Sequence, residues 1–245
     1  MKFTENYLIS CHDEDMRGIV KPSSALRYMQ ECVNSQMREF GPSNDALRRE
    51  GKGFLLSRVY TEILEPLYAG DAIEAQTWSC GQKGFRFFRC HQLLKDGKVV
   101  ARTYSVWALI DINEGKLLRT SEFRAGFDDD PPFETDTLAA PFAVPHTDEM
   151  EFVGEHRVCY AEADINRHMN NTEYPDMLCD HIDLLGKRVS FFAINFQNEA
   201  PLGETLSVYR TVSCDGSILM RTVRGDGKTN IEAKVLLCDC APKFN

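Results

Sequence analysis

The 245-residue sequence has no long apolar run, and no stretch approaches the length that a membrane-spanning helix needs. Its first residues, Met1-Lys2-Phe3-Thr4-Glu5, lack the apolar core of a signal peptide. Positive charge is scarce, because 28 Lys and Arg stand against 37 Asp and Glu and give a net charge of −9. This balance argues against general binding to nucleic acid or to an anionic membrane. We therefore expect a cytoplasmic protein that binds no nucleic acid and inserts into no membrane.

Paired cysteines and metal-ligand spacings are missing as well. The nine cysteines are odd in number and irregularly spaced, which argues against a disulfide framework and for a reducing compartment. Cys238 and Cys240 stand close together, but the two further ligands that a zinc site needs are not evident. The run His12-Asp13-Glu14-Asp15 fits better as part of an internal repeat, described below. We expect no metal and no cofactor.

The most informative stretch that is present runs from Asp164 to Asn171 and reads Asp-Ile-Asn-Arg-His-Met-Asn-Asn. Asp164, Asn166 and His168 alternate along the chain, and in an extended segment they would project from one face. A carboxylate can orient the segment, an amide can hold a carbonyl or water, and an imidazole can exchange a proton at neutral pH. Asn and Asp also cap helices. The motif alone therefore leaves catalysis and capping open.

A weaker copy of this segment lies 151 residues earlier, where Asp13, Asp15 and Arg17 precede Asp164, Asn166 and His168 (164 − 13). Later landmarks recur in the same order: Pro66–Asp71 with Pro201–Glu204, Ser79-Cys80 with Ser213-Cys214, and Asp96-Gly97-Lys98 with Asp226-Gly227-Lys228. Internal similarity of this kind predicts two copies of one structural unit. The first copy lacks the amide and the imidazole, so we expect Asp13 to keep only a structural role. The units span residues 1–120 and 150–245, and residues 121–149, which are rich in Asp and Pro, form the linker.

Each unit has the order strand, helix, then several strands. A helix is predicted from Pro22 to Phe40, because Leu26, Met29, Val33 and Met37 repeat along one face and Gly41-Pro42 ends it. Four strands follow between Phe54 and Asp111, and the linker holds one short helix near Glu134 to Leu138. The second unit has a helix from Thr172 to Leu185, with Tyr174, Met177, Leu178, Ile182 and Leu185 on its buried side, and strands from Val189 to Cys240. This pattern predicts an α+β fold in which each helix packs on an antiparallel sheet and the two sheets join edge to edge.

Over nearly its whole length the chain resembles the acyl-ACP thioesterases of the plant and bacterial type. Members of that family carry the motif Asp-x-Asn-x-His-x-Asn-Asn, here at Asp164 to Asn171, and a glutamate on the strand after the following helix, here Glu199. Ala200 occupies a position where the family usually has cysteine, which weakens a Cys–His mechanism and leaves water as the nucleophile. The resemblance implies a tandem (double) hotdog fold, each unit a long helix packed on an antiparallel β-sheet. It also implies hydrolysis of an acyl-ACP thioester to free fatty acid, which terminates fatty acid synthesis, with acyl carrier protein as partner.

The catalytic roles that follow are hypotheses. Glu199 is the candidate general base, helped by partial burial, and His168 and Asn166 position the water and the carbonyl. Glu199 and His168 could exchange roles. Asp164 holds the motif loop, and backbone amides at the start of the Thr172 helix stabilise the oxyanion.

The first unit is then free to hold the acyl tail, and Leu26, Met29 and Val33 are candidate tail-binding residues, although they could equally be plain core. Acidic carrier protein needs a basic docking patch, for which the clusters Arg48-Arg49-Lys52 and Lys83-Arg86-Arg89 are candidates. Three alternatives stay open: an acyl-CoA thioesterase, a 3-hydroxyacyl dehydratase or hydratase, and a non-catalytic acyl-thioester binding module. Acyl length and the choice between monomer and homodimer are open as well.

Overall fold

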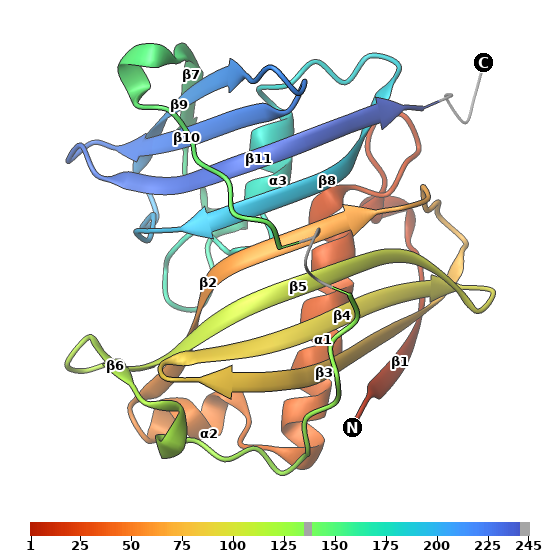
Figure 1. Cartoon of the computed structure of the whole chain (residues 1–245), viewed down its shortest axis with the longest axis vertical. Helices are drawn as coiled ribbons and strands as arrows, with labels where there is room; N and C mark the ends of the chain where they lie inside the picture. Colours follow the sequence, from red (N-terminus) through yellow and green to blue (C-terminus); the bar gives the residue numbers. More distant parts are fainter. Residues whose placement is uncertain (135–138, 241–245) are drawn as a thin grey trace.

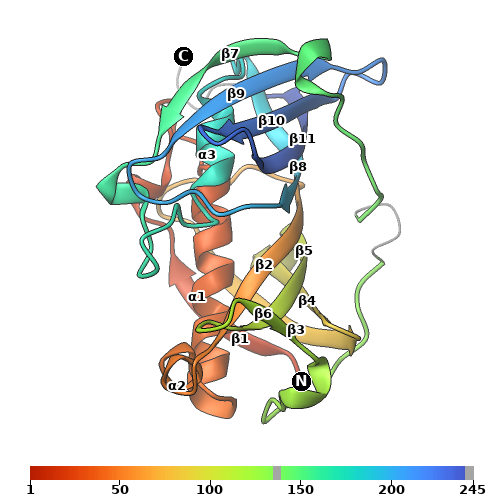
Figure 2. The same cartoon turned by 90° about the vertical axis from the view of Figure 1, so that its left-hand side faces the viewer.

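The structure, a computed structural model, describes residues 1–134 and 139–240. Its described residues form one eleven-stranded antiparallel sheet with the main helices on one face (Figures 1 and 2). The strands are β1 (Phe3–Leu8), β2 (Lys52–Ile63), β3 (Ala72–Lys83), β4 (Arg86–Lys95), β5 (Lys98–Asp111), β6 (Lys116–Leu118), β7 (Glu151–Arg157), β8 (Lys187–Phe196), β9 (Thr205–Val212), β10 (Ile218–Arg224) and β11 (Thr229–Asp239). The helices are α1 (Pro22–Phe40), α2 (Asn44–Arg49) and α3 (Tyr174–Cys179).

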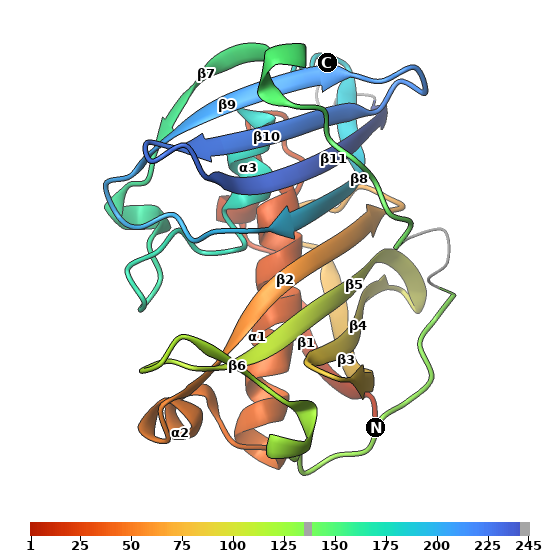
Figure 3. The ribbon, with the colours of Figure 1, turned by 60° about the vertical axis from the view of Figure 1, so that its left-hand side comes forward.

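The two halves of the sheet meet at strands β2 and β8, which lie side by side in the middle (Figure 3). The strand order is β1-β3-β4-β5-β2-β8-β11-β10-β9-β7, and β6 extends β5. Residues from Arg58 to Glu62 of β2 pair antiparallel with Asn195 to Phe191 of β8. This pairing hides one edge strand of each half, and exposed edges invite aggregation. The predicted edge-to-edge junction of two α+β hotdog units is confirmed.

Helix α1 has the bounds that the sequence predicts, Pro22 to Phe40. Proline suits the first turn because its missing N–H would have no partner there. At the other end the Gly41 N–H still bonds to the Met37 carbonyl, but the backbone at Gly41 is extended, as a residue before proline prefers. The predicted face is buried at Leu26, Met29 and Met37 against the inner face of the sheet.

The second helix is much shorter than predicted. Helix α3 contains six residues instead of the expected stretch from Thr172 to Leu185. Beyond Cys179 the amides of His181 and Ile182 bond three residues back, and the His181 carbonyl accepts a hydrogen bond from Arg210. These bonds use the groups that a further helical turn would need. Leu185, expected on the buried side, is 88% exposed, whereas the four other predicted residues, Tyr174, Met177, Leu178 and Ile182, are buried.

The two remaining α-helical segments are α2 and the helix expected in the linker. Helix α2 was not predicted; Ser43 caps it by accepting a hydrogen bond from the Ala46 amide. The short helix expected near Glu134 to Leu138 lies almost wholly outside the described residues. The neighbouring linker crosses the outer face of the sheet, opposite α1 (Figure 2), where Phe133, Ala139 and Phe142 pack against Tyr60 and Ala193. No helix in the described part of the chain is both long and apolar enough to cross a membrane.

The internal repeat is real, but its register differs from the predicted one. Asp15 and Asp164 each form a tight turn in which one carboxylate oxygen accepts two backbone N–H groups, from Arg17 and Ile19 in the first unit and from Asn166 and His168 in the second. Asp15 therefore corresponds to Asp164, at an offset of 149 (164 − 15) rather than 151. Consequently Arg17 matches Asn166, and Ile19 matches His168.

The predicted equivalence of Asp13 with Asp164 is wrong. Asp13 instead matches Glu162, because each carboxylate accepts the backbone N–H three residues earlier, from Ser10 and Cys159. The later landmarks fit in part. Gly70 matches Gly203, because their amides donate to the equivalent carbonyls of Ile9 and Val158, but Pro66 does not match Pro201. Ser79-Cys80 lie within β3, whereas Ser213-Cys214 follow β9. Asp96-Gly97 and Asp226-Gly227 both form hairpin turns, between β4 and β5 and between β10 and β11.

Candidate active site

The motif segment is a folded turn rather than the extended strand that the alternating spacing suggests. The Asp164 carboxylate accepts the amides of Asn166 at 2.8 Å and His168 at 3.2 Å, and the Asp164 amide bonds to the His168 carbonyl at 2.8 Å. Arg167 completes the turn in the left-handed region, with φ 64°. Asp164 thus holds the loop in shape, and its side chain turns back onto the loop's own backbone.

A second set of backbone bonds brings the glutamate to the histidine. The Met169 amide donates to the Ala200 carbonyl, and the Leu202 amide donates to the Arg167 carbonyl, each at 2.8 Å. These bonds pin the loop that follows β8 against the motif turn. The His168 Nδ1 atom then lies 3.2 Å from Glu199 Oε2, which is ion-pair distance. Glu199 itself stands in the loop after β8, not on a strand.

Burial around this pair differs from the expectation. The Glu199 side chain is 55% exposed and that of His168 is 31% exposed, so the desolvation expected for Glu199 is not present. Ala200, at the position where the family usually has cysteine, is fully buried and carries no reactive group. The described residues therefore offer an imidazole–carboxylate pair without a neighbouring thiol nucleophile.

Both polar atoms of the Asn166 side-chain amide form hydrogen bonds. Its Nδ2 donates to Asp164 Oδ2 at 3.1 Å, and its Oδ1 accepts a hydrogen bond from Arg48 Nη2, which reaches across from helix α2 of the first unit. Nδ2 carries a second hydrogen, and none of the described residues accepts it. Among the described residues no hydrogen bond or ion pair joins the Asn166 side chain to Glu199 or His168. The structure therefore brings together the pair His168–Glu199 and, separately, the group Asp164–Asn166–Arg48.

The backbone amides expected to stabilise an oxyanion are already occupied. The Thr172 amide and hydroxyl both donate to Asn170 Oδ1 at 3.1 Å, and the Glu173 amide donates to the Asn170 carbonyl at 2.9 Å. Helix α3 begins only at Tyr174 and has six residues. Asn170 therefore caps this segment, which is the structural role that its residue type favours.

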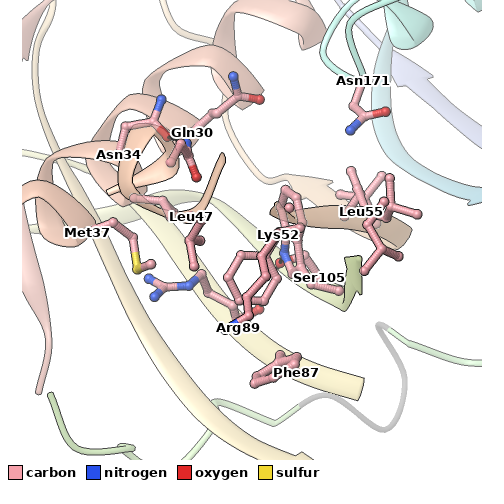
Figure 4. A pocket seen from close by; sticks show the side chains of 18 of the residues that line it. Gln30, Asn34, Met37, Leu47, Lys52, Leu55, Phe87, Arg89, Ser105 and Asn171 are labelled. Carbon is pink, nitrogen blue, oxygen red and sulfur yellow. Dashed lines mark hydrogen bonds between the residues drawn. The ribbon is translucent and has the colours of Figure 1, made fainter. Parts of the chain in front are cut away.

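One cavity of about 1310 Å³ connects the two units. Asp164, Asn166, His168 and Glu199 line one part of it, and helix α1 with the N-terminal sheet lines the rest. Leu26, Met29 and Val33, the predicted tail-binding residues, all lie on its wall. Figure 4 shows the cavity with Asn171 of the motif on one side and Met37 and Arg89 of the first unit on another.

Four arginines line this cavity, and none of them was predicted as a catalytic or tail-binding residue: Arg48, Arg89, Arg124 and Arg224. Arg224 Nη1 donates to the Glu199 carbonyl at 3.1 Å and so helps to hold the glutamate loop. The sequence carries a signal for Arg48, because Ser43 with Asp45 in the first turn and two arginines in the last is a short capped helix. The sequence carries no signal for Arg224, because its contact with Glu199 arises only when β10 and the loop after β8 come together in the fold. Among the described residues no three His, Cys, Asp or Glu side chains form a cluster that could hold a metal ion.

Comparisons with known proteins agree with this geometry. A family profile described as the acyl-ACP thioesterase N-terminal domain matches residues 1–127, and one described as the acyl-ACP thioesterase C-terminal domain matches residues 146–236. A search of curated proteins gives no match.

Two solved structures illustrate the shared fold. An acyl-ACP thioesterase from Bacteroides thetaiotaomicron superposes with a TM-score of 0.85 at 20% identity, covering 97% of this chain and 98% of that one. The 12:0-ACP thioesterase from Umbellularia californica superposes with a TM-score of 0.83 at 14% identity and covers 98% of each chain. The two profiles together span most of the sequence, and the chain belongs to the acyl-ACP thioesterase family of thioester hydrolases.

Proposed function

We propose that the chain hydrolyses fatty acyl thioesters of acyl carrier protein with a water activated by His168, which Glu199 orients. The observation that carries this assignment is the 3.2 Å contact between His168 Nδ1 and Glu199 Oε2 on the wall of the acyl cavity. A carboxylate at Nδ1 favours the tautomer with its proton there, which leaves the Nε2 lone pair free to accept a proton from water. The mainly exposed Glu199 serves better as the orienting group than as the base.

The remaining steps use groups of the motif turn. Water attacks the thioester carbonyl, the C–S bond breaks, and His168 returns the proton to the leaving thiolate. The second Nδ2 hydrogen of Asn166 is the donor that we assign to the oxyanion, since its amide is held by Asp164 and Arg48. Asp164 acts by fixing the turn. The products are a free fatty acid and the carrier thiol, so the reaction ends chain elongation.

The acyl tail extends into the N-terminal part of the cavity. Leu26, Met29 and Val33 of α1 lie there, and a flexible Met side chain adapts to a flexible chain. Because the site is built from both units, we also propose that the two units, residues 1–120 and 150–245, work as one enzyme. Eight of the nine cysteines, those from Cys11 to Cys238, are free thiols in the described part of the chain, which agrees with work in the reducing cytoplasm.

The deciding experiment is single-turnover hydrolysis of acyl carrier protein thioesters as a function of pH. We expect His168→Ala to lower the rate by about 10³-fold, within the usual contribution of a general base. We expect Glu199→Gln to lower it by about 10- to 100-fold, because the amide still accepts the Nδ1 hydrogen but without charge. Glu155→Gln, an exposed glutamate of β7, is the matched control and should be as active as the wild type.

Two outcomes would change the assignment. A Glu199→Gln loss as large as that of His168→Ala would make Glu199 the base, and a fully active, folded His168→Ala variant would remove the histidine from the chemistry. The same assay with acyl-CoA tests the main alternative, an acyl-CoA thioesterase. Equal or higher kcat/KM on acyl-CoA would replace carrier protein as the physiological partner.

A further inference from the structure

The inner face of the N-terminal sheet carries a continuous polar stripe where an acyl-binding surface should be apolar. Its members are cross-strand neighbours that face α1: Thr61 of β2, Thr77 of β3, Arg89 and His91 of β4, and Thr103 and Ser105 of β5. All six are buried. Four of them, Arg89, His91, Thr103 and Ser105, line the cavity that holds the candidate active site.

The C-terminal sheet, which has the same fold, provides an internal comparison. At its inner face the corresponding layer is apolar and includes Phe192, Ile194, Met220 and Ala233. The buried polar pair on that face, Thr222 and Asn230, is satisfied within the protein. The fold itself therefore does not require the stripe, and the polar residues are a feature of the acyl-binding half alone.

Arg89 is the centre of the stripe and is only partly satisfied. Its side chain is 9% exposed, and Nη1 donates to Gln36 Oε1 at 2.6 Å and to Thr77 Oγ1 at 2.9 Å. Nε and Nη2 donate to none of the described residues, and no described carboxylate forms an ion pair with the guanidinium. Burial lowers the pKa of Arg89 to about 10, so the group stays charged at neutral pH. A donor that faces a cavity without a partner in the protein can find its partner in a ligand.

The neighbours of Arg89 add acceptors on the same wall. Ser105 is its cross-strand partner, and the Ser105 oxygen accepts the Trp107 indole N–H at 2.9 Å. The same hydroxyl lies 3.1 Å from His91 Nε2 and 3.3 Å from the Arg89 carbonyl oxygen. The Thr103 hydroxyl bonds only to Thr61 among the described residues. A hydroxyl oxygen has two lone pairs and one hydrogen, so the Thr103 oxygen can accept one more hydrogen bond. The Ser105 oxygen can do so in the His91 tautomer whose Nε2 accepts the Ser105 hydrogen. The cavity wall thus offers a charged donor edge beside hydroxyl acceptors.

We propose that the acyl cavity selects a chain that carries a hydroxyl group at or near its end remote from the thioester, with Arg89 donating to the hydroxyl oxygen and Ser105 or Thr103 accepting its hydrogen. This inference rests on the proposed thioesterase function and names its substrate class. Figure 4 draws Arg89 and Asn171 apart across the cavity, so the polar wall is remote from the motif.

A hydroxyl group fits this wall better than a terminal carboxylate. Asp129 of the linker also lines the cavity, and its charge raises the pKa of Arg89 from beyond ion-pair distance. A second carboxylate would face this charge, whereas a hydroxyl both accepts and donates without adding charge. Arg89 thus has a distant counter-charge, but Nε and Nη2 have no hydrogen-bond acceptor among the described residues. The oxygen of a neutral hydroxyl group can accept from these two atoms.

The test compares carrier-protein thioesters of equal chain length that end in a methyl, a hydroxyl, an oxo or a carboxyl group, over a series of lengths. At the favoured length we expect wild-type kcat/KM to be about tenfold or more higher for the hydroxyl chain than for the methyl chain. Arg89→Met should reverse this preference. Arg102→Met, on the opposite face of β5 and paired with Glu62, is the matched control and should keep it.

A wild-type preference for the methyl chain at every length overturns the proposal, as does an unchanged ratio in a folded Arg89→Met variant. A preference for the carboxyl or oxo chain over the hydroxyl chain also overturns the assigned class. If Arg89→Met does not fold, the wild-type ratios and the binding of free hydroxy fatty acids by calorimetry decide the matter alone. Failure of the thioesterase function is distinct, since no thioester of any kind would then be hydrolysed while acid binding could still be measured.

Discussion

Replacing Asp164 by Asn tests whether the motif carboxylate acts by shaping the turn. Both backbone N–H groups bond to Oδ1, and an asparagine oxygen can keep them. Oδ2 accepts the Asn166 side-chain amide at 3.1 Å, and in the variant an NH₂ group would face that donor. The specific loss is therefore the orientation of the Asn166 amide, not the turn itself.

The size of the effect follows from this one bond. A hydrogen bond to a charged group is worth about 1.5 to 3 kcal/mol, and we take the lower half, about 1.5 to 2 kcal/mol, because Asn166 is exposed. If the bond serves the transition state alone, kcat falls by about 10- to 30-fold and KM changes little. Loss of the carboxylate charge from the turn should cost about 1 kcal/mol of stability, or about 2 to 4 °C in Tm.

The first unit supplies the control. Asp15 forms the same turn, with bonds from the amides of Arg17 at 2.8 Å and Ile19 at 3.3 Å, but no candidate catalytic group follows it. Asp15→Asn should lower Tm by a similar amount and leave kcat unchanged. The assay is steady-state turnover of an acyl carrier protein thioester with thermal unfolding of each variant. Full activity of Asp164→Asn, or an equal loss of kcat in both variants at a temperature where both are folded, would refute the reasoning.

Three further predictions concern stability and docking. In Gly126→Ala the new Cβ would lie 1.8 Å from the Phe40 carbonyl oxygen, so the backbone must shift and calorimetry should show a loss of about 1 to 3 kcal/mol. Burial lowers the pKa of His91 well below its ordinary value, so the unfolded chain binds a proton that the folded protein does not. The free energy of unfolding should therefore fall by up to about 1.4 kcal/mol per pH unit below about pH 6.5, a slope that His91→Gln should reduce in urea titrations. If a basic patch docks the acidic carrier protein, KM for acyl carrier protein should rise with salt while KM for the uncharged acyl-pantetheine does not; two equally flat salt profiles would argue against electrostatic docking.

The fold was predictable where local and long-range signals agree. Helix α1 has a proline at its start, a Gly-Pro pair after its end and an apolar stripe between them, and its predicted bounds match the structure. Helix α3 also has an apolar stripe, but tertiary bonds compete with it. The Arg210 side chain donates a hydrogen bond to the His181 carbonyl. The Asp183 carboxylate accepts a hydrogen bond from the Leu185 amide and forms a turn. The Arg210 bond joins segments 29 residues apart and is not visible in the local sequence, whereas Asp183 is a local turn signal that the apolar stripe outweighed in the prediction.

The predicted register of the repeat is wrong because it matches residue types, whereas the two turns are equivalent in their backbone hydrogen bonds. Asp13 and Asp15 are both acidic, and identity alone favours neither as the partner of Asp164. What identifies Asp15 is the left-handed residue that follows it, Gly18 with φ 74°, which matches Arg167 with φ 64°. Glycine at such a position is a readable signal, but a non-glycine residue there is rare and hides the correspondence.

The candidate site was predictable in part for a similar reason. The motif and Glu199 could be found from the family resemblance, but their approach depends on backbone bonds between segments more than thirty residues apart, Arg167 to Leu202 and Met169 to Ala200. Arg48 and Arg89 were noticed only as members of basic clusters. Arg48 hydrogen-bonds to Asn166 because the two units pack together. Arg89 is buried on the cavity wall because of how the strands of the first unit pack.

The corrected register turns the first unit into a natural control for the second. Val20 donates to Leu67 as Met169 donates to Ala200, so Pro66 stands where Glu199 stands, just as Ile19 stands where His168 stands. The two residues in contact in the second unit are thus both replaced in the first by side chains that cannot exchange a proton. The aspartate of the turn is kept in both. A residue needed only for catalysis has no reason to persist in the unit without the pair. The retained aspartate therefore fits a role in shaping the turn, and this agrees with the proposal that assigns the chemistry to His168 and Glu199.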